Sequence, residues 1–109
     1  MTPIALVQGQ LEAYNDRDLE RFCGYFAQDI TAYDGRTDEV IMDGMEAFRT
    51  RYAEVFSLPD LHCTLVNRMD HGDIIIDQES VVFRKEDPVV KAIAIYRIEN
   101  GVIQEVRFY

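Results

Sequence analysis

The sequence of 109 residues contains no tryptophan, two cysteines, Cys23 and Cys63, and two histidines, His62 and His71. The cysteines form neither a C-x-x-C pair nor a zinc-ligand spacing, so we expect buried free thiols and no metal site. The sequence also lacks a glycine-rich phosphate loop and a Ser-His-Asp arrangement. We therefore expect no bound cofactor and no nucleophilic triad.

Basic residues are scarce. Eleven lysines and arginines face 20 aspartates and glutamates, which gives a net charge of −9. Such a field repels phosphate backbones and anionic lipid, so nucleic acid and membrane surfaces are excluded as partners. No apolar run is long enough to span a bilayer, and the N-terminus lacks the pattern of a signal peptide. We expect a cytoplasmic protein.

Apolar residues make up 48% of the chain, enough for one domain over residues 1–109 with its own core. Apolar positions recur every three or four residues over 3–15, 19–26 and 43–56, which predicts three helices. Segments in which apolar and polar residues alternate, or which are rich in β-branched and aromatic residues, lie between turn signals. They predict strands at 29–34, 61–70, 74–84, 89–98 and 102–109. This order predicts an α+β fold with a mainly antiparallel sheet. Three helices cannot cover both faces of that sheet, so we expect a homodimer through the open face.

Several short segments resemble the nuclear transport factor 2-like superfamily, and within it the SnoaL-like and ketosteroid-isomerase-like branch. They are residues 14–19 (YNDRDL), 26–29 (FAQD), 33–34 (YD), 44–48 (GMEAF) and 96–103 (YRIENGVI). The resemblance covers nearly the whole chain. It implies a cone-shaped, cystatin-like fold with three N-terminal helices packed on a curved sheet around an internal pocket.

The resemblance also assigns positions to individual residues. Asp34 matches the general-base aspartate of ketosteroid isomerase, and Tyr52 matches a supporting tyrosine on the third helix. Gln10 and Ala94 stand where that enzyme has an oxyanion-hole tyrosine and a protonated aspartic acid. The base is therefore present, and both principal oxyanion donors are replaced.

Two sites carry carboxylates on apolar strand patterns. Asp34 shares a strand face with Ile30 and Ala32, and a desolvated carboxylate there would be a usable base. The alternative is a solvated turn residue before Gly35. Asp77 and Glu79 lie on one face of the predicted strand 74–84, together with apolar residues. They could share a proton or bind a ligand rich in hydrogen-bond donors. A bulge that turns them to solvent or to a dimer seam is the alternative.

Four further residues are candidates for ligand contacts. Tyr14 and Tyr52 lie on apolar helix stripes, where a hydroxyl either faces a pocket or is satisfied within the core. Gln10 lies one turn from Tyr14 and could donate to a ligand oxygen, or it could lie on the surface. His62 could shuttle protons in a pocket, or it could be an ordinary strand histidine.

These residues predict an enzyme that uses acid–base chemistry on a small apolar substrate by isomerisation, dehydration or cyclisation. Asp34, Tyr52 and Glu79 are its catalytic candidates, and Gln10, Tyr14, Asp77 and His62 are its substrate-binding candidates. Two alternatives remain open. One is a ligand-binding domain without catalysis, and the other is a dimeric interaction module that works through its sheet face.

Overall fold

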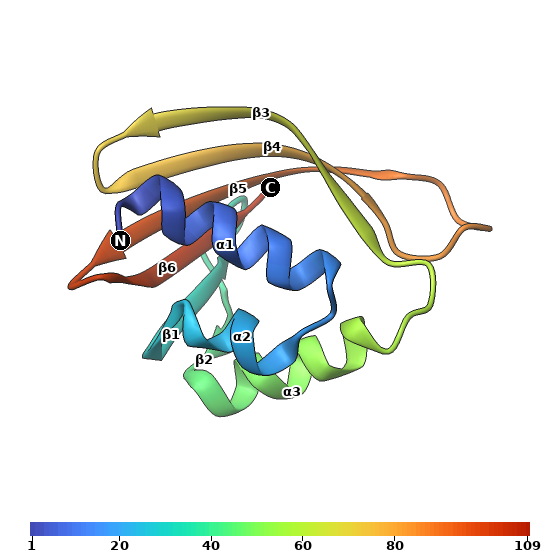
Figure 1. Ribbon diagram of the computed structural model, residues 1–109, viewed down its shortest axis with the longest axis horizontal. Coiled ribbons are helices and arrows are strands. Elements are labelled where there is room, and N and C mark those ends of the chain that lie inside the picture. The colour runs from blue at the N-terminus through green and yellow to red at the C-terminus, as the bar shows by residue number, and fades with distance from the viewer.

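The computed structural model describes residues 1–109 and contains one curved sheet of six strands in the order β2-β1-β6-β5-β4-β3 (Figure 1). The strands are β1 (Phe26–Asp34), β2 (Val40–Asp43), β3 (His62–His71), β4 (Ile74–Val82), β5 (Val90–Glu99) and β6 (Val102–Phe108). β1 and β6 run parallel, and every other neighbouring pair is antiparallel. The helices α1 (Pro3–Asn15), α2 (Leu19–Gly24) and α3 (Met45–Phe56) lie on the concave side. The predicted α+β class is confirmed.

The region from Phe26 to Gly44 differs from the prediction. Phe26 begins β1 instead of closing the second helix, and β2 was not predicted. This strand has only four residues and one buried side chain, Met42, so its sequence carries no recognisable period. The third helix, predicted over residues 43–56, begins at Met45, because Asp43 is the last residue of β2. Gly44 is the N-cap of α3, at φ 86°, and makes no side-chain capping bond.

The two ends of α1 are fixed by specific hydrogen bonds. The Thr2 hydroxyl accepts from the Ala5 amide at 3.2 Å, and Pro3 lies in the first turn, where its missing N–H costs no hydrogen bond. At the other end the Asn15 side chain makes two hydrogen bonds with the Cys63 backbone, at 2.8 and 2.9 Å. Arg17 donates to the carbonyls of residues 58, 59 and 61. These bonds hold α1 against the start of β3.

An aromatic cluster joins the three helices to β1. Phe22 and Phe48 stack with ring centroids 5.7 Å apart, and both are buried. Tyr14, Phe26, Tyr52 and Phe56 surround them with ring centroids 4.6 to 6.3 Å apart. Large rings at this density fix the distance between α3 and the sheet.

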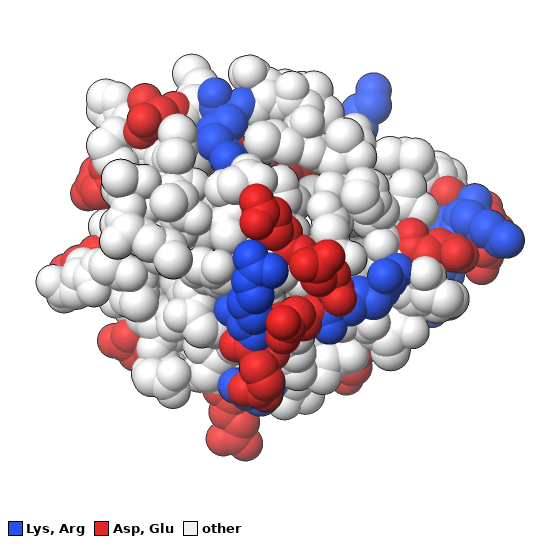
Figure 2. All heavy atoms as spheres, in the orientation of Figure 1, with Lys and Arg blue, Asp and Glu red and all other residues white.

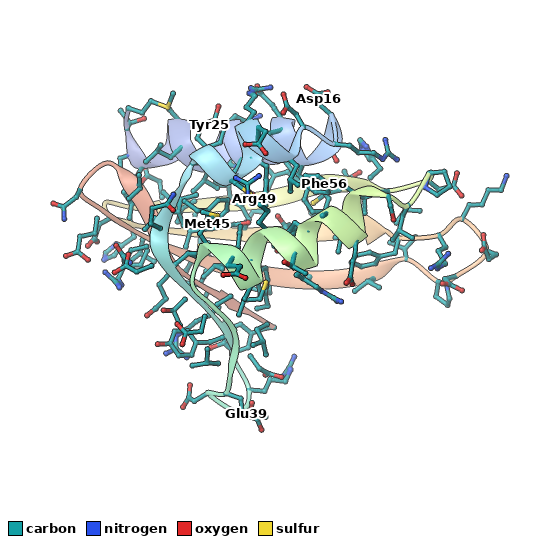
Figure 3. The ribbon with its side chains drawn as sticks, turned by 90° about the horizontal axis from the view of Figure 1, so that it is seen from below. Asp16, Tyr25, Glu39, Met45, Arg49 and Phe56 are labelled. Atoms are coloured by element: carbon teal, nitrogen blue, oxygen red, sulfur yellow. The ribbon has the colours of Figure 1, made fainter.

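The charged side chains of the helical face form small local groups. Arg21 pairs with Glu12 and Asp16, and Arg49 pairs with Glu20. Figure 2 shows acidic and basic side chains interleaved across this face. Figure 3 shows the β1–β2 hairpin, with Glu39 at its tip, extending away from the helices. None of the three helices combines the length and the hydropathy required to cross a membrane.

The concave face of β4 and β5 shapes the interior. Ile75, Asp77, Glu79 and Val81 alternate inward along β4, and all four are buried. The residues opposite Asp77 and Glu79 on β5 are Ala94 and Ala92. Because alanine has no side chain beyond Cβ, these pairs leave space between the sheet and the helices.

Candidate functional site

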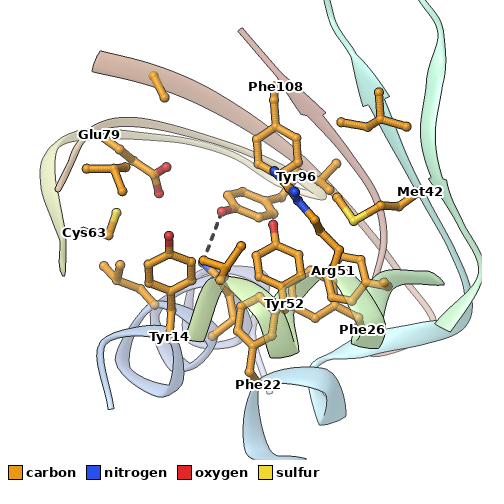
Figure 4. A pocket seen from close by; sticks show the side chains of 18 of the residues that line it. Tyr14, Phe22, Phe26, Met42, Arg51, Tyr52, Cys63, Glu79, Tyr96 and Phe108 are labelled. Atoms are coloured by element: carbon orange, nitrogen blue, oxygen red, sulfur yellow. Dashed lines mark hydrogen bonds between the residues drawn. The ribbon is translucent and has the colours of Figure 1, made fainter. Parts of the chain in front are cut away.

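A cavity of about 260 Å³ lies between α1, α3 and the concave face of β4, β5 and β6. Most of its lining is apolar, and Ala92, Val81 and Val106 form part of its floor. At the rim, Ile41 and Val90 are 51% and 44% exposed. The polar side chains that line the cavity are few (Figure 4): Gln10, Tyr14, Arg51, Tyr52, Cys63, Glu79 and Tyr96. An apolar pocket with a few convergent polar groups is the usual form of a small-molecule site.

Glu79 is the carboxylate in this cavity. Its side chain faces inward because β4 keeps a strict alternation, and the residue is 8% exposed. No nitrogen or oxygen donor of the protein hydrogen-bonds to it. Every side-chain nitrogen or oxygen that is fully buried in this structure has a hydrogen-bond partner. The Glu79 oxygens have none, so they are not fully buried, and the side chain lines the cavity.

The surroundings of Glu79 favour its neutral form. Burial raises its pKa, and the charge of Asp77 raises it further, to about 7. The Cys63 thiol, from the neighbouring strand, and the Arg68 charge act in the opposite direction and are outweighed. Glu79 can therefore both accept and release a proton near neutral pH, as a general base or acid requires.

Three tyrosine hydroxyls accompany Glu79. Figure 4 shows Tyr14 from α1, Tyr52 from α3 and Tyr96 from β5 with their hydroxyls turned toward the same central space as the carboxylate. Burial raises the pKa of all three, and nearby negative charge raises it further. They therefore remain protonated and can donate hydrogen bonds to an oxygen atom of a ligand.

Gln10 is buried, at 4% exposure, and its amide orients Tyr96. The amide nitrogen donates to the Val7 carbonyl at 3.0 Å and to the Tyr96 hydroxyl oxygen at 3.2 Å. The Tyr96 oxygen thus acts as an acceptor from the protein, and its own proton remains available to the cavity.

Asp77 faces the same side as Glu79 but does not line the cavity. Its two oxygens accept from Arg68 Nε and Nη2 at 2.7 and 2.9 Å, and Arg68 also donates to Gln8 on α1. Arg68 is the cross-strand partner of Asp77 on β3. The bulge considered for β4 lies in β3 instead, around Val66, so both β4 carboxylates stay inside. Asp77 is therefore occupied by an ion pair and is not free for a ligand.

Asp34 lies outside the cavity, which corrects the expectation that it faces the helices. Its Oδ1 accepts from the backbone amides of Arg36 and Thr37 at 2.9 and 3.3 Å. An aspartate at the start of a turn readily accepts hydrogen bonds from the backbone amides of that turn. These local bonds, and not the alternation of the strand, determine the direction of the Asp34 side chain. The pairing of β1 with β2 also shifts register just before Asp34.

His62 is exposed on the outer face of β3, so it too lies away from the cavity. Its neighbour Cys63 points inward instead. The sequence-based interpretation did not single out Cys63, Arg51, Arg68 or Tyr96 as site residues. Ala92, Ala94 and Tyr96 are two residues apart in the predicted strand 89–98, so they lie on one face of it. A tyrosine beside two small residues on one face is the signal that could have identified Tyr96.

A three-helix layer on a curved mixed sheet with an inner cavity defines the cystatin-like class of the nuclear transport factor 2-like superfamily. A family model described as SnoaL-like domain matches residues 7–106, and the chain belongs to this family. No protein of curated function matches the sequence.

Solved structures agree on the fold. A cystatin-fold protein of uncharacterised function from Novosphingobium aromaticivorans aligns with TM-score 0.88 and 22% identity over 100% of this chain and 98% of its own. A candidate ketosteroid isomerase from Kribbella flavida aligns with TM-score 0.82 and 19% identity over 95% and 73%. A candidate polyketide cyclase from Sinorhizobium meliloti aligns with TM-score 0.82 and 16% identity over 96% and 94%. At these identities the likeness shows the fold alone.

Proposed function

We propose that this protein is an acid–base enzyme that transfers a proton on a small, largely apolar substrate, with Glu79 as the base. One observation carries the proposal. The Glu79 carboxylate opens into an apolar cavity, accepts no hydrogen bond from a nitrogen or oxygen donor of the protein, and has a pKa of about 7. A base whose pKa lies near the working pH is present in its active form and transfers the proton efficiently.

The reaction class follows from the groups around Glu79. The carboxylate would remove a proton from a carbon next to a carbonyl group, and negative charge would develop on the carbonyl oxygen. Tyr96, oriented by Gln10, would donate its proton toward that oxygen, with Tyr14 or Tyr52 as a second donor. The proton held by Glu79 would then return at another carbon or to a leaving group. Isomerisation, dehydration and cyclisation all share these steps.

The comparisons are consistent with this class. The candidate ketosteroid isomerase and the candidate polyketide cyclase named above have the same fold. The assignment of the base differs from the position that the family resemblance favoured, which is Asp34. Asp34 therefore supplies the matched comparison for Glu79.

The test uses an activated apolar substrate, nitrobenzisoxazole, which loses a carbon-bound proton to a general base and reports the reaction by its colour. We expect Glu79→Gln to lower the rate by about two orders of magnitude and Asp34→Asn to leave it unchanged. The reverse pattern would transfer the role of base to Asp34. Binding of the compound with no rate above that of acetate would favour a ligand-binding domain without catalysis.

The apolar lining supports that second candidate, a binding domain, because an apolar cavity takes up small molecules whether or not it turns them over. In both cases we propose a homodimer through the outer sheet face. Ile93 and Ile95 of β5 lie on that face with half-buried side chains, and Tyr109 is 39% exposed. Sedimentation that shows a monomer at micromolar concentration would reject the dimer.

A further inference from the structure

Arg51 is the one lysine or arginine that lines the cavity. It comes from α3 and is exposed at the rim, and Ile41 and Met42 line both the cavity and the neighbouring surface groove together with it. Figure 4 shows its guanidinium turned toward the cavity, on the side of Phe108. The charge therefore stands at an otherwise apolar opening.

Arg51 forms no ion pair with an acidic side chain. The neighbouring surface groove, which Arg51 also lines, contains Asp43, Glu46 and Glu54, yet none of them lies within 4.0 Å of its guanidinium. Arg49, two residues earlier on the same helix, is instead paired with Glu20. The guanidinium of Arg49 is therefore occupied by an ion pair, whereas that of Arg51 is available to an anionic ligand.

The charge of Arg51 acts toward the inside of the cavity. Burial and the Glu79 charge raise the pKa of Tyr52, and Arg51 partly opposes them. The two side chains line the same cavity, and the positive charge of Arg51 favours the ionised form of Tyr52.

The opposite end of the cavity has the opposite polarity. Glu79 lines it there with no lysine or arginine beside it in the lining, because Arg68 is occupied by Asp77 outside the cavity. A carboxylate placed at that end would meet like charge in a poorly solvated space, which is costly. An anion at the rim would instead meet the planar guanidinium, which binds carboxylates through two parallel hydrogen bonds.

We propose that Arg51 determines substrate specificity by binding the carboxylate of a mono-anionic apolar substrate, whose uncharged reactive end lies between Glu79 and the tyrosines. The orientation of the reactive end rests on the proposed function, whereas the recognition of the carboxylate does not. The cavity volume of about 260 Å³ lies just below the usual range of ligand pockets, which is roughly 300–1,000 Å³. A single ring with a short acidic chain suits that size.

The test measures binding and needs no turnover. Phenylacetate, phenylpropanoate and phenylbutanoate are each titrated against the protein and compared with the corresponding amide, which has the same shape and no charge. We expect the best-fitting carboxylate to bind roughly 3- to 10-fold more tightly than its amide, because a charge-assisted hydrogen bond at a partly exposed site has about that effect. Arg51→Gln should abolish this preference and leave the affinity for the amide unchanged.

Arg49→Gln is the matched control, since it removes the same charge from the same helix at a residue that does not line the cavity. It should retain the preference for the carboxylate. Equal affinities in the wild-type protein, a preference that survives Arg51→Gln, or no carboxylate binding at millimolar concentration would each overturn the inference. If Arg51→Gln abolishes the preference but Glu79→Gln leaves proton transfer unchanged, the carboxylate site stands and the proposed function fails.

Discussion

The side-chain amide of Gln10 lies between two oxygens, the Val7 carbonyl at 3.0 Å and the Tyr96 hydroxyl at 3.2 Å. The Val7 carbonyl can only accept, so the group that faces it must be the amide nitrogen and not the amide oxygen. The same nitrogen then donates to Tyr96. This arrangement links the first helix to a strand 86 residues later in the sequence and leaves the Tyr96 proton directed to the cavity.

Tyr96→Phe should reduce turnover much more than it reduces stability. Loss of a donor to a developing oxyanion lowers kcat by about 10²- to 10³-fold and changes KM little. Gln10 keeps its bond to Val7, so the free energy of unfolding should fall by only about 1 kcal/mol. Steady-state kinetics and urea denaturation measure the two effects. An unchanged kcat would show that the Tyr96 hydroxyl does not assist the reaction.

Glu79 should make stability depend on pH between its unfolded and folded pKa values, about 4.5 and about 7. The folded pKa is raised, so the folded state binds the proton more tightly than the unfolded chain does. The contribution of Glu79 is fully present below pH 4.5 and is lost as the pH rises through 7. A shift of this size corresponds to on the order of 3 kcal/mol.

Glu79→Gln removes this dependence. Over the pH range from 4.5 to above 7, the free energy of unfolding of the wild-type protein should fall relative to that of the variant. Comparing the two proteins cancels the titration of the other carboxylates. Parallel curves would show that Glu79 titrates at an ordinary pKa. The rate of a base-catalysed reaction should rise over the same range, because only the ionised form accepts a proton.

Arg68→Met should destabilise the protein by about 3–5 kcal/mol, because it leaves the fully buried Asp77 charge without a partner. The double variant Arg68→Met, Asp77→Leu should recover most of this loss, since replacing both ions by apolar groups removes the unpaired charge. Urea denaturation of the three proteins provides the comparison. A double variant as unstable as the single one would mean that the pair itself, and not the orphaned charge, accounts for the loss.

Gly9→Ala and Gly24→Ala should have opposite effects on stability. A Cβ at Gly9 would lie 2.5 Å from the Tyr25 ring, so the ring must move, at a cost of about 1–3 kcal/mol. Nothing lies within 4 Å of a Cβ at Gly24, where alanine should stabilise the helix by about 0.5–1 kcal/mol. Thermal denaturation distinguishes them. Two stabilised variants would show that Tyr25 does not require glycine at position 9.

The sequence by itself determined the three helices, the four long strands of the second half and the inward face of β4. Strong periodicity placed the three helices and the four long strands, since amphipathic patterns follow directly from helix and strand geometry. The alternation of apolar residues with Asp77 and Glu79 indicated two carboxylates on one side of the sheet. A short strand such as β2 carries too few residues to show a period, and it became visible only in the structure.

The tertiary structure decided which of those residues belong to the site. The position of Asp34 in its strand indicated that its side chain faces the interior. Its carboxylate instead accepts hydrogen bonds from backbone amides of the following turn and lies outside the cavity. Asp77 is occupied by Arg68 from β3, whereas Glu79, two residues later, faces open space beside Ala92. Tyr96, Gln10 and Arg51 converge on that space from separate elements. Periodicity describes each element alone, and only the relative placement of α1, α3 and the sheet determines which side chains meet.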